Sequence, residues 1–254
     1  MLDDPRELPE SRAAAIIAAG LSQRNRIGEI MDDPGLESSE HERALRGLGR
    51  INRFSRSASI LWPAIAEEAA RSSERPIRVL DLASGGGDVS IELARRARRR
   101  GLSIQIDGGD VSPIAVEYAA RSAASAGVPV RFFRLDALND PLPEDYNVVT
   151  CSLFLHHLAE EQAIRLLGKM AGASRSRVLV NDLLRSPVGY SLAWAGCRLL
   201  SRSPVVHHDG PASVRSAFRL DEVRDLARRA GLERTRIDRR WPWRFLLSWS
   251  RKDG

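Results

Sequence analysis

The chain has 254 residues, long enough for one elaborated domain, and its 43% apolar and 28% charged residues are the balance of an ordinary globular protein. No run approaches the roughly 18 uncharged apolar residues of a membrane span, and the acidic start MLDDPRELPE lacks the apolar core of a secretory signal. The two cysteines are too few for a disulfide scaffold or a cysteine-rich zinc site, and they fit a reducing cytoplasm. The net charge of +6 could serve nucleic-acid binding, but all but two of the 39 basic residues are arginines spread along the whole chain, which favours a general compositional bias over a nucleic-acid partner.

The first 72 residues are predicted to form a helical extension or cap. A short Ala-rich helix is expected over 12–21, followed by a turn at the Pro34-Gly35 pair. Apolar residues then recur at spacings of three and four, which predicts helices over about 41–57 and 62–72. Pro63 is expected to break this stretch, because proline lacks an N–H and clashes with the preceding turn.

From residue 73 to the end we expect a single core domain, in which short apolar strands alternate with helices. The strands are expected over 77–82, 103–108, 130–135, 146–152 and 177–182, with helices over 88–100, 113–126 and 159–172 between them. A helix over 220–230 and two closing strands, about 233–239 and 242–249, complete the chain. This alternation predicts an α/β fold with a Rossmann-like, mostly parallel seven-stranded sheet and helices on both faces.

An insertion over 184–217 follows the fifth strand. It contains an apolar stretch, residues 190–200, and then the segment SRSPVVHHDGPAS, which is expected to be a loop. An apolar insertion here is predicted to be a lid over a small apolar or aromatic acceptor, although core packing produces apolar stripes more often than ligand binding does. The proposed pocket wall consists of Leu45, Leu48, Ile51, Phe54, Trp62, Tyr190, Trp194 and Leu199.

A glycine cluster joins the first strand to its helix in the segment VLDLASGGGDV, residues 79–89. Glycines at such a turn let a ligand approach the backbone, and the helix behind them presents free N–H groups. The spacing is neither that of a P-loop nor that of a dinucleotide-binding GxGxxG. Asp110 and Asp136 end the next two strands, where an acid can bind ribose hydroxyls, although Asp110 could also cap a helix and Asp136 could be a turn residue.

These segments, taken in order, resemble those of class I S-adenosylmethionine-dependent methyltransferases. VLDLASGGGDVS resembles the family's VLDxGCGTG loop, GGDVSPIAVEYA its GxDxSxxxLxxA segment, RLDALNDPLP its adenine-contacting segment, and YNVVTCSLFLHHL its DxVxxxxxLHHL motif. Ala83, Ser84 and Gly86 depart from the usual Gly, Cys and Thr, and Asn147 departs from the usual Asp. The resemblance covers about residues 76–183 and implies S-adenosyl-L-methionine as the cofactor.

The resemblance also implies a role for each matching residue. The two glycines would let the backbone approach the methionine and ribose portion, the acid of the first strand would orient the loop, and the acid of the second would accept hydrogen bonds from the ribose. The third acid and the amide after it would contact the adenine, and the end of the fourth strand would lie beside the sulfonium. The predicted cofactor-binding residues are Asp81, Ala83, Ser84, Gly85, Gly87, Asp110, Val111, Asp136, Ala137, Cys151 and Ser152.

Two histidine pairs are candidates for a general base that would take a proton from the acceptor. His156 and His157 follow the fourth strand; because adjacent residues point in different directions, we expect at most one to face the site, and a buried helix-capping histidine is the alternative. His208, beside Asp209, could act as a base or lie in a solvated loop. No metal is expected, because two separated histidine pairs do not specify a ligand geometry and the resembled family mostly needs none.

The predicted function is methyl transfer to a small apolar or aromatic acceptor, of phenolic or polyketide type. The segments NDLLRSPVGYSLAW and WPWRFLLS resemble a bacterial subgroup thought to act on such metabolites, and O-methylation is favoured. C-methylation of a quinone-like ring, methylation of RNA or protein, and a catalytically inactive cofactor-binding module are the alternatives. We expect a cytoplasmic enzyme of secondary metabolism, without nucleic-acid or integral membrane contacts, that could form a homodimer.

Overall fold

The computed structural model describes residues 20–33, 35–72 and 76–251. The helix predicted over 12–21 therefore lies outside the described residues, apart from its last two positions. Among the described helices, none combines the length and the apolar character that crossing a membrane requires.

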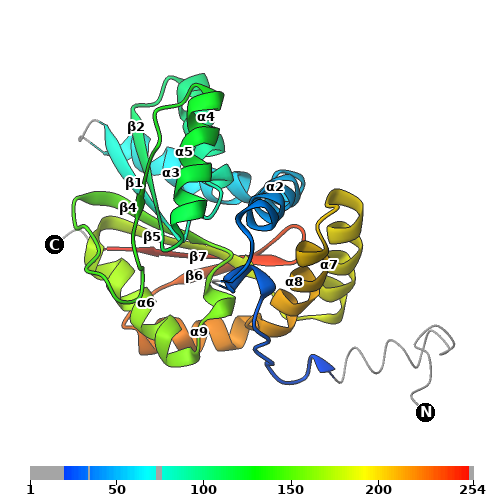
Figure 1. Ribbon diagram of the computed structural model, residues 1–254. Coiled ribbons are helices and arrows are strands. Elements are labelled where there is room, and N and C mark those ends of the chain that lie inside the picture. Colours follow the sequence, from blue (N-terminus) through cyan, green and yellow to red (C-terminus); the bar gives the residue numbers. More distant parts are fainter. Residues whose placement is uncertain (1–19, 34, 73–75, 252–254) are drawn as a thin grey trace, which may run out of the picture.

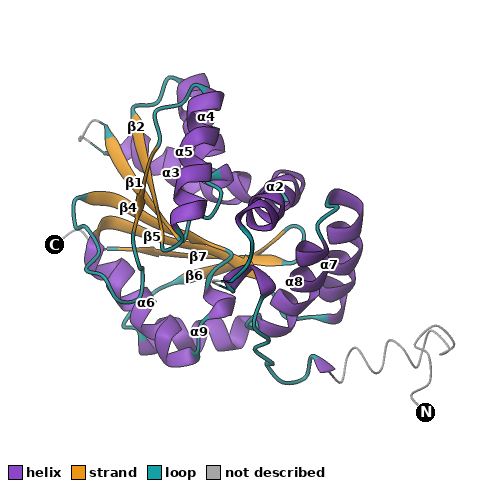
Figure 2. Ribbon diagram, viewed as in Figure 1, coloured by secondary structure: helices purple, strands orange, loops and turns teal. Residues whose placement is uncertain are grey.

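A seven-stranded sheet forms the centre of the molecule (Figure 2), in the order β3-β2-β1-β4-β5-β7-β6. The strands β1 to β5 run parallel to one another, and β7 runs antiparallel to both β5 and β6. This confirms the predicted Rossmann-like α/β fold with a closing hairpin. The chain order reverses between β1 and β4, which is the place where open sheets of this kind bind ligands. The strands are β1 (Ile77–Leu82), β2 (Ile104–Asp110), β3 (Arg131–Arg134), β4 (Tyr146–Ser152), β5 (Ser174–Leu183), β6 (Arg236–Arg240) and β7 (Arg244–Ser250).

Helices cover both faces of the sheet (Figure 1). One face carries α3 (Ser57–Arg71), α4 (Asp88–Arg100) and α5 (Pro113–Ala126), and the other carries α6 (Glu160–Ala173) and α9 (Leu220–Arg229). Successive side chains of a strand point to opposite faces, so Val148 packs in the core cluster with α3 and α4, while Val149 packs in the cluster with α6 and α9. The continuous apolar runs of the sequence therefore supply both cores, as buried parallel strands do.

Three further helices, α2 (Ser38–Phe54), α7 (Pro187–Leu200) and α8 (Pro204–Ser216), lie together beyond the carboxyl ends of the parallel strands (Figure 1). They share a small core of their own, in which Ala44 of α2 packs with Cys197 of α7 and with Val205 and Val206 of α8. The N-terminal extension and the insertion after β5 therefore meet at the same end of the sheet.

The predicted helix break at Pro63 is wrong. The chain breaks at Arg56 instead, which has a left-handed φ of 60°, and Pro63 lies inside α3. Proline costs this helix one N–H bond, but Ile65 and Trp62 on the same helix are buried against the sheet. Tertiary packing of this kind contributes most of the stability of a helix in a protein, so the helix continues through the proline.

The predicted loop over 201–213 is also wrong, because the segment forms α8. Pro204 lies in the first turn, where the missing N–H has no intrahelical partner to lose. Val206, Asp209 and Val214 are buried on one side of the helix, and this burial overrides the poor helix propensity of the His-His-Asp-Gly-Pro segment.

Most of the residues predicted to line an acceptor pocket serve packing or face solvent. Trp62 belongs to the core cluster of α3, whereas Phe54, Trp194 and Leu199 are exposed. Leu48 and Ile51 pack against the small core that α2 shares with the insertion. The apolar stripes therefore do not by themselves define a binding site.

Ala83, directly after β1, has a φ of 50°, a region in which a residue with a Cβ is strained by about 1 kcal/mol or more. Ala83→Gly is therefore expected to raise the free energy of unfolding in urea by about 1 kcal/mol. The control is Ala120→Gly on the exposed side of α5, which is expected to lower that free energy by about 1 kcal/mol. A loss of stability in both variants would contradict the strain at Ala83.

Candidate active site

Of the three glycines in the loop after β1, Gly85 is the least tightly packed. This residue has a φ of 52°, and a Cβ placed on it would meet only Leu45 Cδ2 of α2, at 4.0 Å. The next two glycines are needed for packing: a Cβ on Gly87 would lie 2.5 Å from Phe132 Cζ, and one on Gly86 would lie 3.1 Å from Tyr118 Cε1. Of the glycines predicted to bind a cofactor, Gly85 is thus the one whose backbone has no neighbour closer than ordinary van der Waals contact.

Asp110, at the end of β2, is tied to this loop. Its Oδ2 accepts the N–H of Gly85 at 2.8 Å, and its Oδ1 accepts the N–H of Ser112 at 2.9 Å. The alternative role of Asp110 as a helix cap is wrong, because Ser112 caps α5 by accepting the N–H of Ala115. Each carboxylate oxygen can accept a second hydrogen bond, so Asp110 is suited to ribose hydroxyls. Val111, which follows it, is exposed at the same edge.

Asp81 lies buried at the end of β1 and joins the loop to its surroundings. The hydroxyl of Ser90 on α4 donates to its Oδ2 at 2.5 Å, and the hydroxyl of Thr150 on β4 donates to its Oδ1 at 2.9 Å. Burial raises the pKa of Asp81 to about 6, in spite of these two hydrogen bonds. The residue therefore holds the start of α4 against the sheet, as its predicted role in orienting the loop requires.

Two buried hydroxyls at this edge lack a hydrogen-bond partner among the described residues, Ser84 Oγ in the loop and Ser152 Oγ at the end of β4. The buried side-chain amide of Asn181, which stands opposite Ser152 in register, has neither its nitrogen nor its oxygen bonded. A buried unpaired polar group costs about 1–3 kcal/mol, so these atoms indicate where a ligand would be held. The Cys151 side chain, in contrast, packs in the main core, where burial raises the pKa of its thiol.

The residues predicted to contact adenine form a turn of their own after β3. Asp136 Oδ1 accepts the N–H groups of Leu138 and Asn139, and its Oδ2 accepts the side-chain amide of Asn139. The bond from this amide is the main reason why the pKa of Asp136 is lowered. The carbonyl of Ala137 accepts a hydrogen bond from Lys169. The turn role that the sequence left open for Asp136 is thus present, and its contact with a cofactor stays a prediction.

His156 and His157 lie in the 3-10 turn η3 (Leu155–His157), just beyond the end of β4. His156 is buried, with its Nδ1 2.6 Å from Asp182 Oδ1, and its backbone N–H donates to the other oxygen of this carboxylate. Burial alone would lower the pKa of His156, but Asp182 and Glu29 outweigh burial and raise it to about 10. The two imidazole rings lie against each other, with centroids 4.3 Å apart.

Glu29 completes this cluster, and sequence reasoning missed it. Its Oε1 lies 3.5 Å from His156 Nε2 and 3.8 Å from His157 Nε2, and it accepts the hydroxyl of Ser213 on α8 at 2.5 Å. Burial opposes ionisation of Glu29, yet the two histidines and Ser213 lower its pKa. Both histidines therefore approach the same carboxylate although they are adjacent in sequence. That at most one of them faces an acceptor stays a prediction.

An irregular segment, residues 21–31, carries Glu29 across the end of the sheet; we call it the N-terminal strap. Asp209 on α8 accepts the N–H groups of Ile30 and Met31 at 3.0 and 3.1 Å. Arg24 donates to the carbonyls of His156, Leu158 and Ser216. The strap is thus fixed to both η3 and the insertion. No periodicity or motif in the sequence marks it.

His208 does not join this cluster. Its half-exposed ring is bonded through Nδ1 to Asp209 Oδ1, on the α8 carboxylate that also holds the strap. The predicted pairing with an acid is therefore present, but the acid serves to anchor backbone N–H groups.

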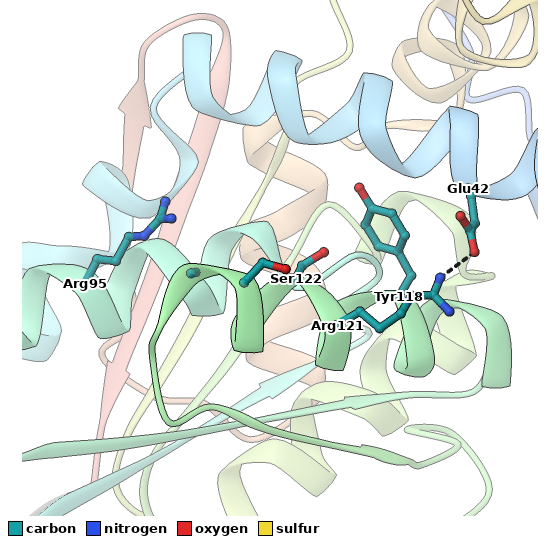
Figure 3. Close-up of a pocket in the computed structure, with 7 residues that line it drawn as sticks. Glu42, Arg95, Tyr118, Arg121 and Ser122 are labelled. Atoms are coloured by element: carbon teal, nitrogen blue, oxygen red, sulfur yellow. Dashed lines mark hydrogen bonds and ion pairs between the residues drawn. The ribbon is translucent and has the colours of Figure 1, made fainter.

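The strap, η3 and α8 enclose a cavity of about 320 Å³, lined by Arg26, Ile27, Gly28, Glu29, His156, His157 and Ser216. A second hollow of about 350 Å³ lies on the outer side of α5. Figure 3 shows Tyr118 and Arg121 extending from α5 toward α2, where Glu42 meets Arg121. Arginines and serines dominate this second lining, as on an ordinary solvated face, whereas the first cavity gathers a carboxylate and two imidazoles.

The unfolded chain ionises Asp81 near 3.8, whereas the folded protein keeps its proton up to about pH 6. The wild-type protein is therefore expected to lose about 3 kcal/mol of stability from this group as the pH rises from about 4 to 6. Asp81→Asn removes the titration, so the variant should gain stability relative to wild type over this range in urea unfolding at a series of pH values. Parallel curves for the two proteins would contradict the raised pKa.

The chain is similar to known methyltransferases. Residues 79–176 match a family model described as a methyltransferase domain. A demethylmenaquinone methyltransferase of Thermus thermophilus is 32% identical over 56% of this chain and 62% of its own length. A ubiquinone biosynthesis O-methyltransferase of Pseudomonas putida is 30% identical over 64% of this chain and 67% of its own length. The chain thus spans less than two thirds of the length of the first of these curated relatives and about two thirds of the second.

A solved structure of the plantazolicin methyltransferase BpumL in complex with SAH superposes with a TM-score of 0.64, over 95% of this chain and 97% of that chain. The sequence identity is 14%, so this likeness shows the shared fold alone.

Proposed function

This chain belongs to the class I S-adenosylmethionine-dependent methyltransferase family, and from that premise we propose that it transfers the cofactor's methyl group to a hydroxyl of a small aromatic acceptor. The main support is the position of two features at one edge of the sheet. One is the open backbone at Gly85 beside Asp110, and the other is the cavity that holds His157 and Glu29.

The residues at the first feature fit the cofactor chemically. The ribose hydroxyls need acceptors, which Asp110 offers, and the methionine portion needs a close approach to the backbone, which Gly85 permits. The unpartnered hydroxyls of Ser84 and Ser152 would gain hydrogen bonds. When bound, the cofactor supplies an electrophilic methyl group on a sulfonium. When this methyl group is transferred, the sulfonium becomes a thioether.

The second feature suits a small ring compound. Small-molecule pockets measure roughly 300–1,000 Å³, and a cavity of about 320 Å³ lies at the low end of this range. Its wall includes the apolar Ile27 as well as the polar Glu29 and His157. The two polar side chains would orient a hydroxyl at one end of a ring. A buried carboxylate would repel the phosphates of a nucleic acid, and this argues against RNA as the acceptor.

The relatives support an aromatic acceptor without distinguishing the atom methylated. One is named as a ubiquinone biosynthesis O-methyltransferase and another as a demethylmenaquinone methyltransferase. The second name favours C-methylation of a quinone-like ring as the alternative reaction. We favour oxygen because a hydroxyl can hydrogen-bond to the cluster of His156, His157 and Glu29.

The chain's own contribution would be alignment and exclusion of water. Transfer of a methyl group requires the nucleophile, the methyl carbon and the sulfur in line. The strap and α8 cover the cavity through the contacts of Asp209 and Arg24, so they would hold the ring while they exclude water.

Cofactor binding tests the first half of this proposal. We expect the wild-type protein to bind S-adenosylmethionine or its demethylated product in calorimetry, and Asp110→Ala to weaken this binding at least about tenfold, since hydrogen bonds to a charged group contribute roughly 1.5–3 kcal/mol. Asp238→Ala, on the outermost strand β6, is the control and should bind as wild type does. No binding at millimolar cofactor would contradict the proposal.

Methyl transfer to a panel of phenols and hydroquinones tests the second half. His157→Ala is expected to lower kcat about 100-fold or more, as loss of a group that activates the nucleophile does, while His208→Ala should retain most of the activity. If His208→Ala costs as much as His157→Ala, the acceptor lies elsewhere. Nuclear magnetic resonance of the product distinguishes a methoxy group from a methyl group on carbon.

A further inference from the structure

We propose that Glu29, His156 and His157 form a binding site for a divalent transition-metal ion. Each of the three residues offers one ligand atom that lies within 4.8 Å of those of the other two. Glu29 Oε1 is near the Nε2 atoms of both histidines. This departs from the sequence-based expectation of no metal, which considered the histidine pairs without the third ligand.

The spacing of these atoms suits one ion. A tetrahedral ion with bonds of about 2.1 Å places neighbouring ligand atoms about 3.4 Å apart. Glu29 Oε1 lies 3.5 Å from His156 Nε2 and 3.8 Å from His157 Nε2, so the carboxylate oxygen stands close to this ligand-to-ligand distance from both imidazoles.

The surroundings of the three ligands also fit a metal site. Asp182 Oδ1, 2.6 Å from His156 Nδ1, can accept the proton of this nitrogen and leave Nε2 as the one that faces Glu29. Such carboxylate–histidine pairs are the usual support of metal-bound imidazoles. On the other ligand, the Ser213 hydroxyl of α8 donates to Glu29 Oε1 itself and so holds the carboxylate in place. Two ligands are therefore already oriented without an ion.

The charge balance of the cluster favours a cation. Two carboxylates, Glu29 and Asp182, face two imidazoles that are neutral when they bind a metal, so the ligand cluster itself carries negative charge that a divalent ion would compensate. The buried Arg244 balances part of the charge of Asp182 and leaves Glu29 as the carboxylate nearest the ion. Arg26 also lines the cavity, but it is exposed at the rim, where water and salt screen its charge. A proton on His156 is the rival occupant, and the experiment below distinguishes the two.

The ligand types indicate which ion would bind. Two imidazoles and one carboxylate are typical of Zn²⁺ or Fe²⁺ sites that keep an open position, whereas Mg²⁺ and Ca²⁺ prefer oxygen ligands alone. The open position would face the cavity beside Ser216 and Ile27. If the proposed function holds, an acceptor hydroxyl bound there would lose its proton more readily, as metal-bound water does.

The test is a titration of chelator-treated, full-length protein with Co²⁺, which reports its ligands through visible absorption, and with Zn²⁺ in calorimetry. We expect one equivalent to bind wild type at micromolar concentration, with the intense bands of a low-coordinate Co²⁺ site. Glu29→Gln and His157→Ala should each weaken binding about tenfold or more, and Asp182→Asn by about 10–100-fold. His207→Ala, which removes a histidine of α8 outside the cluster, should change nothing.

Circular dichroism and thermal unfolding of each variant show whether it is folded, and Glu29→Gln is the decisive change because it keeps the size of the side chain. Absence of binding to wild type, or undiminished binding to either Glu29→Gln or His157→Ala, overturns the proposal and leaves a protonated His156 between its carboxylates. The titration contains neither acceptor nor cofactor, so failure to bind a metal does not contradict the proposed methyl transfer. Failure to bind the cofactor in the separate calorimetry experiment likewise does not contradict the metal site.

Discussion

The buried contact between His156 and Asp182 determines the arrangement of the candidate site. It joins the turn that follows β4 to the last residues of the neighbouring parallel strand β5, and the register that places Ser152 opposite Asn181 brings the two together. The contact fixes the ring of His156, and the carbonyl of the same residue accepts a bond from Arg24 of the strap. The position of Glu29 therefore depends on a turn that is itself set by the sheet.

The two halves of the site are built differently. The half around Gly85 and Asp110 comes from loops at the ends of adjacent strands, so any chain with this sheet and these loops would form it. The half around Glu29 comes from an irregular segment held by α8, and it depends on contacts between distant parts of the sequence. Such a division is expected in a fold that supports one reaction on different acceptors. The loops of the sheet would then serve the shared reaction, and the segments placed on this rigid scaffold would determine which acceptor binds.

The sequence predicted what local pattern determines. Apolar runs and glycine turns placed the strands of the sheet, and the order of motifs placed Gly85 and Asp110 at one edge. It failed where packing overrides local preference, as at Pro63 in α3. It could not find Glu29 at all, because one acid in a segment without periodicity carries no signal until its partners on α8 and η3 are known.

The individual site residues show the same limit. Asp136 and Cys151 occupy the motif positions of their family, yet Asp136 bonds to its own turn and the Cys151 side chain faces the core. A motif fixes where the backbone runs, whereas the direction and the partners of a side chain depend on neighbours that the motif does not include.

The way the strap is held has a consequence for biosynthesis. Glu29 is made before the sheet, but Asp209 and Ser213, which hold it, leave the ribosome only after the parallel strands have been translated. The nascent protein would thus assemble the edge around Gly85 and Asp110 first and the cluster around Glu29 last. Likewise, proteolytic cleavage within the strap would separate Glu29 from its partners and leave the edge around Gly85 and Asp110 in place.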